Sequence, residues 1–260
     1  MSEQTVLYEE YGNVALVTLN RQKQLNSFNG ELVSELLDSL HKAENDPAVR
    51  VVVLTGAGRA FCAGGDLEYL DTLLTVNDRR LFIAKVGSIV KTIFDMSKPV
   101  VAMVNGVAAG AGANLAIACD LVFAADTVKF VQSFAKVGLA PDCGGLYVLP
   151  RIVGLLKAKE LMFTADPISA QEALELKLVN RVLPAEELSA QVMEFAGALS
   201  RSAPLAIGMI KKALNSTYNM SLPESLVGES LTNGILLGTN DFAEGVNAFK
   251  EKRAPEFTGN

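Results

Sequence analysis

Short, nearly unbroken runs of apolar residues recur along the first half of the chain. Four of them lie at residues 14–20, 51–55, 99–106 and 121–126, and valine is frequent in them. An apolar run of this length is typical of a strand that is buried on both faces, as in a parallel sheet. The sequence therefore predicts a sheet that contains these four segments.

Helical periodicity follows most of these runs. The spacing predicts helices over 29–45 and 78–96, with others beginning near 66 and 111, and Pro99 marks the end of the second. Residues 129–145 are predicted to be mostly irregular. From residue 146 onward the pattern is helical through to 252, apart from a strand within 178–184.

The order strand, turn, helix recurs up to about residue 190, and helices alone follow it. This order predicts an α/β protein, and it favours a spiral of repeated units over a doubly wound sheet. We expect a core over 1–190 and a C-terminal helical region over 191–260.

Composition narrows the classes of protein that the chain can belong to. Half of the 260 residues are hydrophobic and the net charge is -6, which disfavours nucleic-acid partners and anionic membranes. No apolar stretch approaches the roughly 20 residues that cross a bilayer, and the N-terminus lacks the pattern of a signal peptide. Three cysteines without a CxxC pair predict a reduced, cytoplasmic protein.

The chain contains one histidine and no tryptophan. His41 lies in a predicted amphipathic helix and is expected to face solvent, so a Ser-His-Asp or Cys-His mechanism has no suitable histidine. A zinc site also lacks ligands, and no metal is expected. Catalysis must therefore depend on carboxylates, backbone amides or a cofactor.

Two glycine-rich turns, FCAGGD at 61–66 and NGVAAGAGANLA at 105–116, each follow a predicted strand and open a helix. Neither contains a P-loop, and neither has the third small residue of a dinucleotide-binding fingerprint. One such turn alone is more typical of tight packing. Two together can direct free N–H groups at one point, which an enolate or tetrahedral oxyanion requires.

The segments LNRQKQLNSFN, LTGAGRAFCAGGDL, KPVVAMVNGVAAGAGANLAIACDLVFAAD and VNAFKEKRAPEFTG resemble the enoyl-CoA hydratase/isomerase (crotonase) superfamily. The resemblance covers nearly the whole chain. It implies a crotonase-like ββα-spiral core with a C-terminal helical trimerisation region, assembled as a homotrimer or a dimer of trimers. It also implies an acyl-CoA thioester substrate, with coenzyme A entering as part of that substrate and no other cofactor required.

By matching motif positions, the resemblance implies an oxyanion hole made by the backbone N–H groups of Gly65 and Ala111. It implies substrate or coenzyme A contacts for a larger set, namely Arg21, Lys23, Leu25, Ala63, Gly64, Asp66, Asn114, Phe134, Phe249 and Lys252. Phe249 and Lys252 are expected to reach the coenzyme A of a neighbouring subunit. Asp66 is in addition a candidate helix cap.

Asn114 and Phe134 stand where hydratases of the family resemble one another in having catalytic glutamates. Without either glutamate, ordinary hydration of an enoyl-CoA is not expected. Asp142, in GLAPDCGG, is then either a helix N-cap or the acid/base residue of the epoxyphenylacetyl-CoA isomerase-like branch of the family. A double-bond shift needs one base and no water, so a single carboxylate near apolar residues fits an enoyl-CoA isomerase.

Three other functions remain open. A hydratase or lyase with displaced catalytic groups would use Glu68, close to the first turn. A dehalogenase that uses Asp142 as a nucleophile is disfavoured, because the chain has no tryptophan and its histidine lies elsewhere. The third is a non-catalytic binder of CoA esters or an RNA-associated homologue, and the net charge of -6 disfavours RNA. Lys211 and Lys212 are expected on a solvated helix face.

Overall fold

Strands and helices alternate in the computed structural model, which describes residues 4–260. In that part of the chain a large sheet has the spatial order β1-β2-β3-β5-β7-β10. Its strands are β1 (Val6–Tyr11), β2 (Val14–Leu19), β3 (Val51–Gly56), β5 (Val100–Val104), β7 (Leu121–Ala125) and β10 (Arg181–Leu183). β1 is antiparallel to β2, and the remaining neighbours are parallel.

A smaller sheet with the order β4-β6-β8-β9 lies beside the large one. Its short strands are β4 (Ala60–Cys62), β6 (Val107–Ala109), β8 (Lys129–Val131) and β9 (Ile168–Ser169). β4, β6 and β8 follow β3, β5 and β7 directly in the chain, and helical structure follows each of them. The repeated strand–strand–helix unit confirms the predicted α/β spiral.

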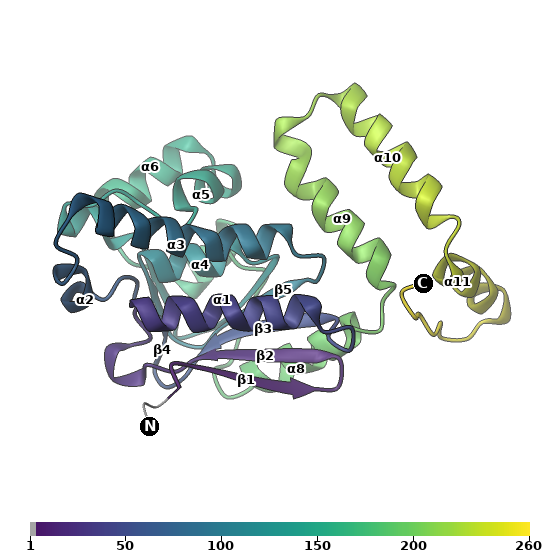
Figure 1. Ribbon diagram of the computed structural model, residues 1–260, viewed down its shortest axis with the longest axis horizontal. Helices are drawn as coiled ribbons and strands as arrows, with labels where there is room; N and C mark the ends of the chain where they lie inside the picture. Colours follow the sequence, from purple (N-terminus) through teal and green to yellow (C-terminus); the bar gives the residue numbers. More distant parts are fainter. Residues whose placement is uncertain (1–3) are drawn as a thin grey trace.

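Three helices pack on the large sheet, namely α1 (Gly30–Asn45), α4 (Ala111–Ala118) and α8 (Leu188–Leu199), and α3 (Val76–Asp95) packs on α1 and α4. α1 lies beside α3 (Figure 1), and both α4 and α8 pack on β5 and β7. Every residue of β3 and β5 is buried as a result, which is why these strands are unbroken apolar runs.

Capping side chains set where the first two long helices begin. The Asn29 side chain accepts a hydrogen bond from the Leu32 N–H at 2.9 Å, so the helix predicted over 29–45 is confirmed as α1. Thr75 and Asp78 form a reciprocal capping box, and α3 therefore begins two residues earlier than the periodicity predicts.

The sequence pattern does not predict β1, half of which is exposed, or the strands of the smaller sheet. β4 overlaps the first glycine-rich turn, β6 lies in the second, and the segment at 129–145 contains β8 and the 3₁₀ turn η2 (Ser133–Val137). Strands of three residues carry too few positions to show a period, and they exist because they pair with one another in the second sheet. The remaining elements are η1 (Gln22–Gln24), α2 (Leu67–Asp71), α5 (Gly145–Val153), α6 (Leu155–Thr164), α7 (Ala170–Glu175) and η3 (Thr217–Asn219).

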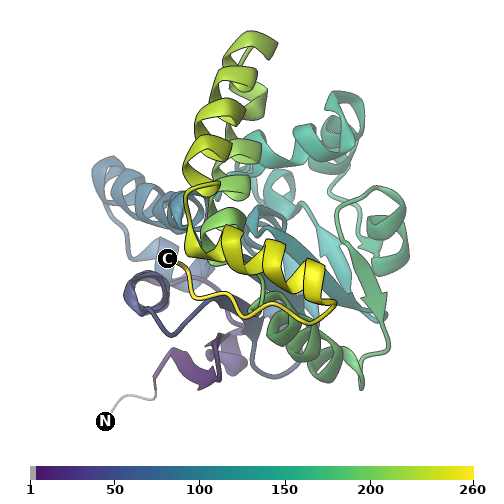
Figure 2. The same ribbon diagram turned by 90° about the vertical axis from the view of Figure 1, so that its right-hand side faces the viewer.

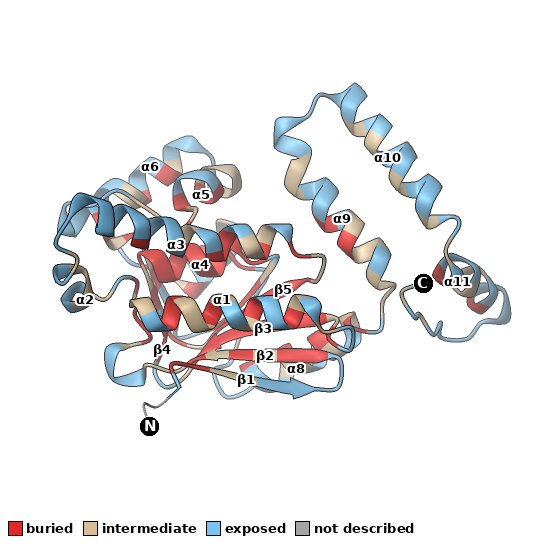
Figure 3. Ribbon diagram, viewed as in Figure 1, coloured by how far each residue is buried: buried red, intermediate tan, exposed pale blue. Residues whose placement is uncertain are grey.

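The C-terminal helices extend away from the sheets as an arm. It consists of α9 (Pro204–Ser216), α10 (Leu222–Leu236) and α11 (Asn240–Glu251), and two views show it projecting from the core (Figures 1 and 2). α10 contains no buried residue (Figure 3). The boundary predicted at residue 190 falls within α8, which packs on the sheet. No helix in residues 4–260 combines the length and apolar character that crossing a bilayer requires.

One prediction about the arm is wrong. Lys211 of α9 is not solvated, because its side chain is 5% exposed and its Nζ lies 2.7 Å from Asp120 Oδ2. The same ammonium donates to the Lys98 carbonyl at 2.9 Å. Asp120 also accepts from the Val100 N–H at 2.7 Å, so this ion pair joins the arm to the start of β7. Lys212 is exposed, as predicted.

Candidate active site

The first glycine-rich turn leaves one backbone donor free. The Phe28 N–H donates to the Gly64 carbonyl at 2.7 Å, and the Asp66 N–H donates to the Phe28 carbonyl at 3.0 Å. Gly65 lies between these two bonds, and no acceptor within residues 4–260 pairs with its N–H. The turn thus exposes a fixed donor just before α2.

The second turn leaves a donor free at a helix start. The Gly110 N–H donates to the Val131 carbonyl at 2.8 Å, and the Asn114 N–H closes the first turn of α4 on the Gly110 carbonyl at 3.1 Å. Ala111 is the first residue of α4, where the N–H has no partner within the helix. The helix dipole favours negative charge at this point.

The two turns are in close contact. A Cβ atom placed on Gly64 would lie 3.4 Å from the Ala111 nitrogen and 2.9 Å from the Ala109 carbonyl oxygen. Gly64 has a φ of +99°, which side chains rarely adopt. Only glycine therefore lets the first turn lie against the second.

Gly65, Ala111 and Asp142 line one cavity of about 130 Å³. The rest of its wall is mainly apolar and comes from α2, α3 and the segment around η2, with Leu70, Val86, Phe134, Val137 and Leu139 among its residues. Asp142 carries the only carboxylate on this wall within residues 4–260. The structure thus brings together the three residues that the sequence singles out for catalysis.

Asp142 is held by its backbone, and its carboxylate is unpaired. Its carbonyl accepts from the Asn114 side-chain amide at 2.8 Å and from the Gly145 N–H at 2.9 Å. Its Oδ1 is buried, and no partner for it lies within residues 4–260. Burial raises the pKa of this carboxyl to about 6, because an ionised group is poorly solvated there. The alternative role as an N-cap is wrong, since the α5 cap is Gly144 and has no side-chain hydrogen bond.

Several predicted contact residues have other partners. Asp66 caps α2 by accepting from the Tyr69 N–H at 3.2 Å, and its Oδ2 lies 2.9 Å from an Arg21 guanidinium nitrogen. Arg21 also donates to the Ser27 carbonyl at 2.7 Å. Asn114 is fully buried and off the cavity wall. Glu68 is exposed and does not line the cavity either, so it is not placed where a displaced hydratase carboxylate would act.

The residues expected along coenzyme A lie in two places. The Ala63 N–H donates to the Leu25 carbonyl at 3.0 Å, so the loop that carries Leu25 and the exposed Lys23 lies beside the first turn. Phe249 and Lys252 lie at the C-terminal end of α11, and Phe249 is 86% exposed. α11 is far from α2 and α3 (Figure 1). These two residues do not line the cavity of their own chain.

Sequence reasoning missed two buried polar residues near the site. Asn26 is fully buried and donates to the carbonyls of Ala57 and Ala60 at 2.9 and 2.8 Å. Gln132 is 8% exposed and donates to Asn114 Oδ1 at 2.9 Å. A polar residue directly after Phe130 and Val131 of β8 is a signal that could have drawn attention to Gln132.

Comparison with known proteins agrees with this geometry. The enoyl-CoA hydratase/isomerase family model matches residues 9–260. A 1,2-epoxyphenylacetyl-CoA isomerase of Escherichia coli (strain K12) is 39% identical, with 95% of each chain covered. A crotonyl-CoA hydratase of Syntrophomonas wolfei is 36% identical, with 99% of each chain covered. The crystal structure of an enoyl-CoA hydratase from Bacillus anthracis is similar with a TM-score of 0.95 and 34% identity, over 99% of this chain and 100% of that one.

The repeated strand–strand–helix core and its cavity define an enzyme of the crotonase fold. The chain belongs to the enoyl-CoA hydratase/isomerase family. The predicted superfamily and fold are thereby confirmed. Relatives of similar identity are named for isomerisation and for hydration, so the particular reaction has to be argued from the site.

Proposed function

We propose that this protein is an enoyl-CoA isomerase that shifts a double bond through a thioester enolate. The single observation that carries this proposal is the lone, unpaired carboxylate of Asp142 on the wall that also holds the free N–H groups of Gly65 and Ala111. Asn114 and Phe134 supply no carboxylate, so no second group is available to activate water.

The proposed reaction is a 1,3-proton shift. Asp142 removes a proton from a carbon next to the double bond, and the electron pair moves to the thioester carbonyl oxygen. The two N–H groups stabilise the resulting oxyanion, and one such donor is typically worth about 2.7–4 kcal/mol. Asp142 then returns the proton at the other end of the conjugated system, so nothing is gained or lost. A carboxyl pKa of about 6 keeps the base ionised at neutral pH and still basic.

Size and polarity of the cavity favour a compact acyl group. Its volume of about 130 Å³ is close to the roughly 150 Å³ of an apolar cavity that binds benzene. Coenzyme A arrives as part of the substrate, and the proposed steps require no other cofactor. We expect kcat/KM to be higher for a six-carbon 3-enoyl-CoA than for a twelve-carbon one, which a steady-state comparison measures.

The decisive experiment is Asp142→Asn, assayed for conversion of a 3-enoyl-CoA into the conjugated 2-enoyl-CoA. We expect kcat to fall by about 10²–10⁴-fold, the usual worth of a general base, while the thioester still binds. Glu68→Gln is the matched control and keeps wild-type rates. A folded, thioester-binding Asp142→Asn variant with unchanged kcat would remove Asp142 from the mechanism.

Hydration is the second candidate, because relatives such as the Syntrophomonas wolfei protein are named as hydratases. Water addition to crotonyl-CoA distinguishes it from isomerisation. We expect the isomerase rate to exceed the hydration rate at equal substrate concentration. The absence of turnover with every enoyl-CoA would favour a binding protein instead.

We further propose that the arm assembles the protein into a homotrimer or a dimer of trimers. α10 has no buried residue, and its apolar residues Leu226, Leu231 and Ile235 are each more than half exposed. Exposed apolar side chains gathered on one helix indicate an interaction site. The molar mass in solution, measured by light scattering, tests the assembly, and Leu231→Glu is expected to reduce it.

A further inference from the structure

Two buried amide side chains form a chain of hydrogen bonds behind the cavity. Gln132 Nε2 donates to Asn114 Oδ1 at 2.9 Å, and Asn114 Nδ2 donates to the Asp142 carbonyl at 2.8 Å. Asn114 is 0% exposed and Gln132 is 8% exposed. The chain thus runs from the end of β8 through α4 to the peptide of Asp142.

The direction of these bonds is set by the Asp142 carbonyl. A carbonyl can only accept, so Asn114 must turn its NH₂ group toward it, which leaves Asn114 Oδ1 facing Gln132. Gln132 must then present its own NH₂ group. Its Oε1 is left buried, without a partner in residues 4–260.

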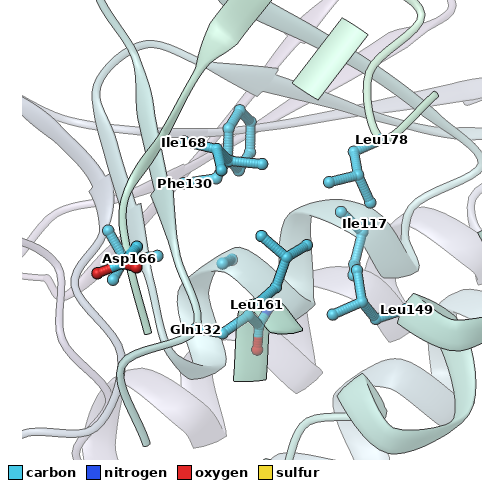
Figure 4. A pocket seen from close by; sticks show the side chains of 10 residues that line it. Ile117, Phe130, Gln132, Leu149, Leu161, Asp166, Ile168 and Leu178 are labelled. Carbon is cyan, nitrogen blue, oxygen red and sulfur yellow. The ribbon is translucent and has the colours of Figure 1, made fainter. Parts of the chain in front are cut away.

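Within residues 4–260 the Gln132 side chain makes no hydrogen bond other than the one to Asn114. It lies on the wall of a second, small cavity with Ile117, Phe130, Leu149 and Leu161 (Figure 4). Asp166 is the one charged residue on this wall, and within residues 4–260 no hydrogen bond joins it to Gln132. The contact with Asn114 therefore decides how Gln132 is oriented.

The carboxylate of Asp142 has no comparable support of its own. Within residues 4–260 no other residue donates a hydrogen bond to it, and its Oδ1 is buried without a partner. The next residue, Cys143, has a φ of +48°, which is unfavourable for a side chain other than glycine. The position of the carboxylate thus depends on how firmly its backbone is held.

We propose that Gln132 and Asn114 are positioning residues that hold the Asp142 peptide so that its carboxylate faces the reacting carbons. This inference rests on the proposed isomerase function. Neither amide touches the substrate cavity, so both act through Asp142. A misplacement of about 1 Å can cost about 10²-fold in rate.

Gln132→Glu and Gln132→Met test the proposal. The methionine variant keeps the side-chain length but cannot donate, so we expect kcat to fall by about 10- to 100-fold at every pH. In the glutamate variant, a protonated carboxyl group can still donate to Asn114, whereas an ionised one cannot. The nearby charged groups are Asp142, which lies beyond Asn114, and Asp166, which lines the small cavity. Both disfavour ionisation of a glutamate at position 132.

The expected signature is therefore a difference in pH profile. Wild-type kcat rises as Asp142 ionises and then levels off, whereas kcat of Gln132→Glu falls again at high pH. Wild-type kcat in both variants, together with a Gln132→Glu profile that levels off like wild type, would overturn the proposal. If either variant fails to fold, Gln132→Ala, which only removes atoms, is expected to show the same loss of kcat.

A measurement without substrate separates this inference from the proposed function. The Asp142 carboxyl group is titrated by ¹³C NMR in the free protein, with its resonance assigned from Asp142→Asn. Its pKa is about 6 in the wild type and is expected to fall toward the ordinary value of 3.8 in Gln132→Met, as the carboxylate moves toward water. An unchanged pKa would refute the positioning role even if the enzyme proves not to be an isomerase.

Discussion

Two helices of this protein, α4 and α10, meet opposite surroundings. All eight residues of α4 are buried between the sheets and its neighbouring helices, whereas none of the fifteen residues of α10 is buried. In α4 every side chain is enclosed by its neighbours, and one chain of hydrogen bonds runs through Asn114 to the peptide of Asp142. α10 contacts α9, yet none of its side chains is buried within residues 4–260. α4 thus contributes to the wall of the cavity, whereas α10 presents apolar side chains to solvent.

The largest effect is expected where the C-terminal arm meets the core, at the ion pair between Lys211 and Asp120. Lys211→Met leaves Asp120 partly buried without its cation, and losing one partner of such a pair costs about 3–5 kcal/mol. Burial already raises the pKa of Asp120, so the loss of stability should shrink at low pH, where this carboxyl takes up a proton. Urea denaturation measures it. Lys212→Met, on the exposed face of the same helix, is the control and should change stability by less than about 0.5 kcal/mol.

Asp142→Asn is expected to stabilise the core by about 3 kcal/mol above pH 7. The pKa of this carboxyl is raised to about 6 in the folded protein, so the folded state binds the proton more tightly than the unfolded chain does. The contribution of Asp142 to the free energy of unfolding is therefore most favourable below about pH 4, and it is lost as pH rises through about 6. Denaturation at pH 4 and pH 8 should show the gain only at the higher pH. An equal gain at both would contradict burial as its cause.

Gly112→Ala tests how tightly α4 is packed. A Cβ atom there would lie 2.1 Å from the Cys62 carbonyl oxygen, and a backbone atom cannot move away at little cost. We expect a loss of about 1–3 kcal/mol from this overpacking. The rate should fall as well, because the change pushes α4 away from β4 and so separates the two turns. Thermal denaturation and the isomerase assay measure the two effects.

The smallest effect is expected from the same substitution in α10. No atom lies within 4 Å of a Cβ placed on Gly234, and alanine is favoured over glycine in a helix interior by about 0.8–1.0 kcal/mol. Gly234→Ala should therefore stabilise the protein slightly and leave the rate unchanged. If it destabilises the protein as Gly112→Ala does, the contrast between the two helices is wrong for the assembled protein.

The sequence predicts some parts of the fold well for a physical reason. The strands β3 and β5 are buried on both faces, so their sequences are continuous runs of apolar residues that can be recognised directly. Helix α1 can be predicted from its capping residue, Asn29, and from apolar residues at helical spacing. The motifs around Gly65 and Ala111 could be located because close backbone approach requires small residues in a row.

Other features depend on pairings that no local pattern records. β4, β6 and β8 are too short to show a period, and they are strands only because they meet in one sheet. Lys211 lies in an ordinary helical pattern, and its burial follows from Asp120, which is far away in the chain. The role of Gln132 likewise depends on Asn114, which lies on another element.

The two free donors of the site belong to the main chain, and their positions are fixed by backbone pairing with Phe28 and Val131. No single side-chain replacement can delete them without disturbing the fold. Under the proposed mechanism, substitutions can therefore exchange the acid–base groups around the cavity while the two N–H donors stay in place. Descendants of one ancestor can in this way acquire different reactions on the same class of thioester, and a change of reaction need not pass through a form that has lost its hold on the substrate.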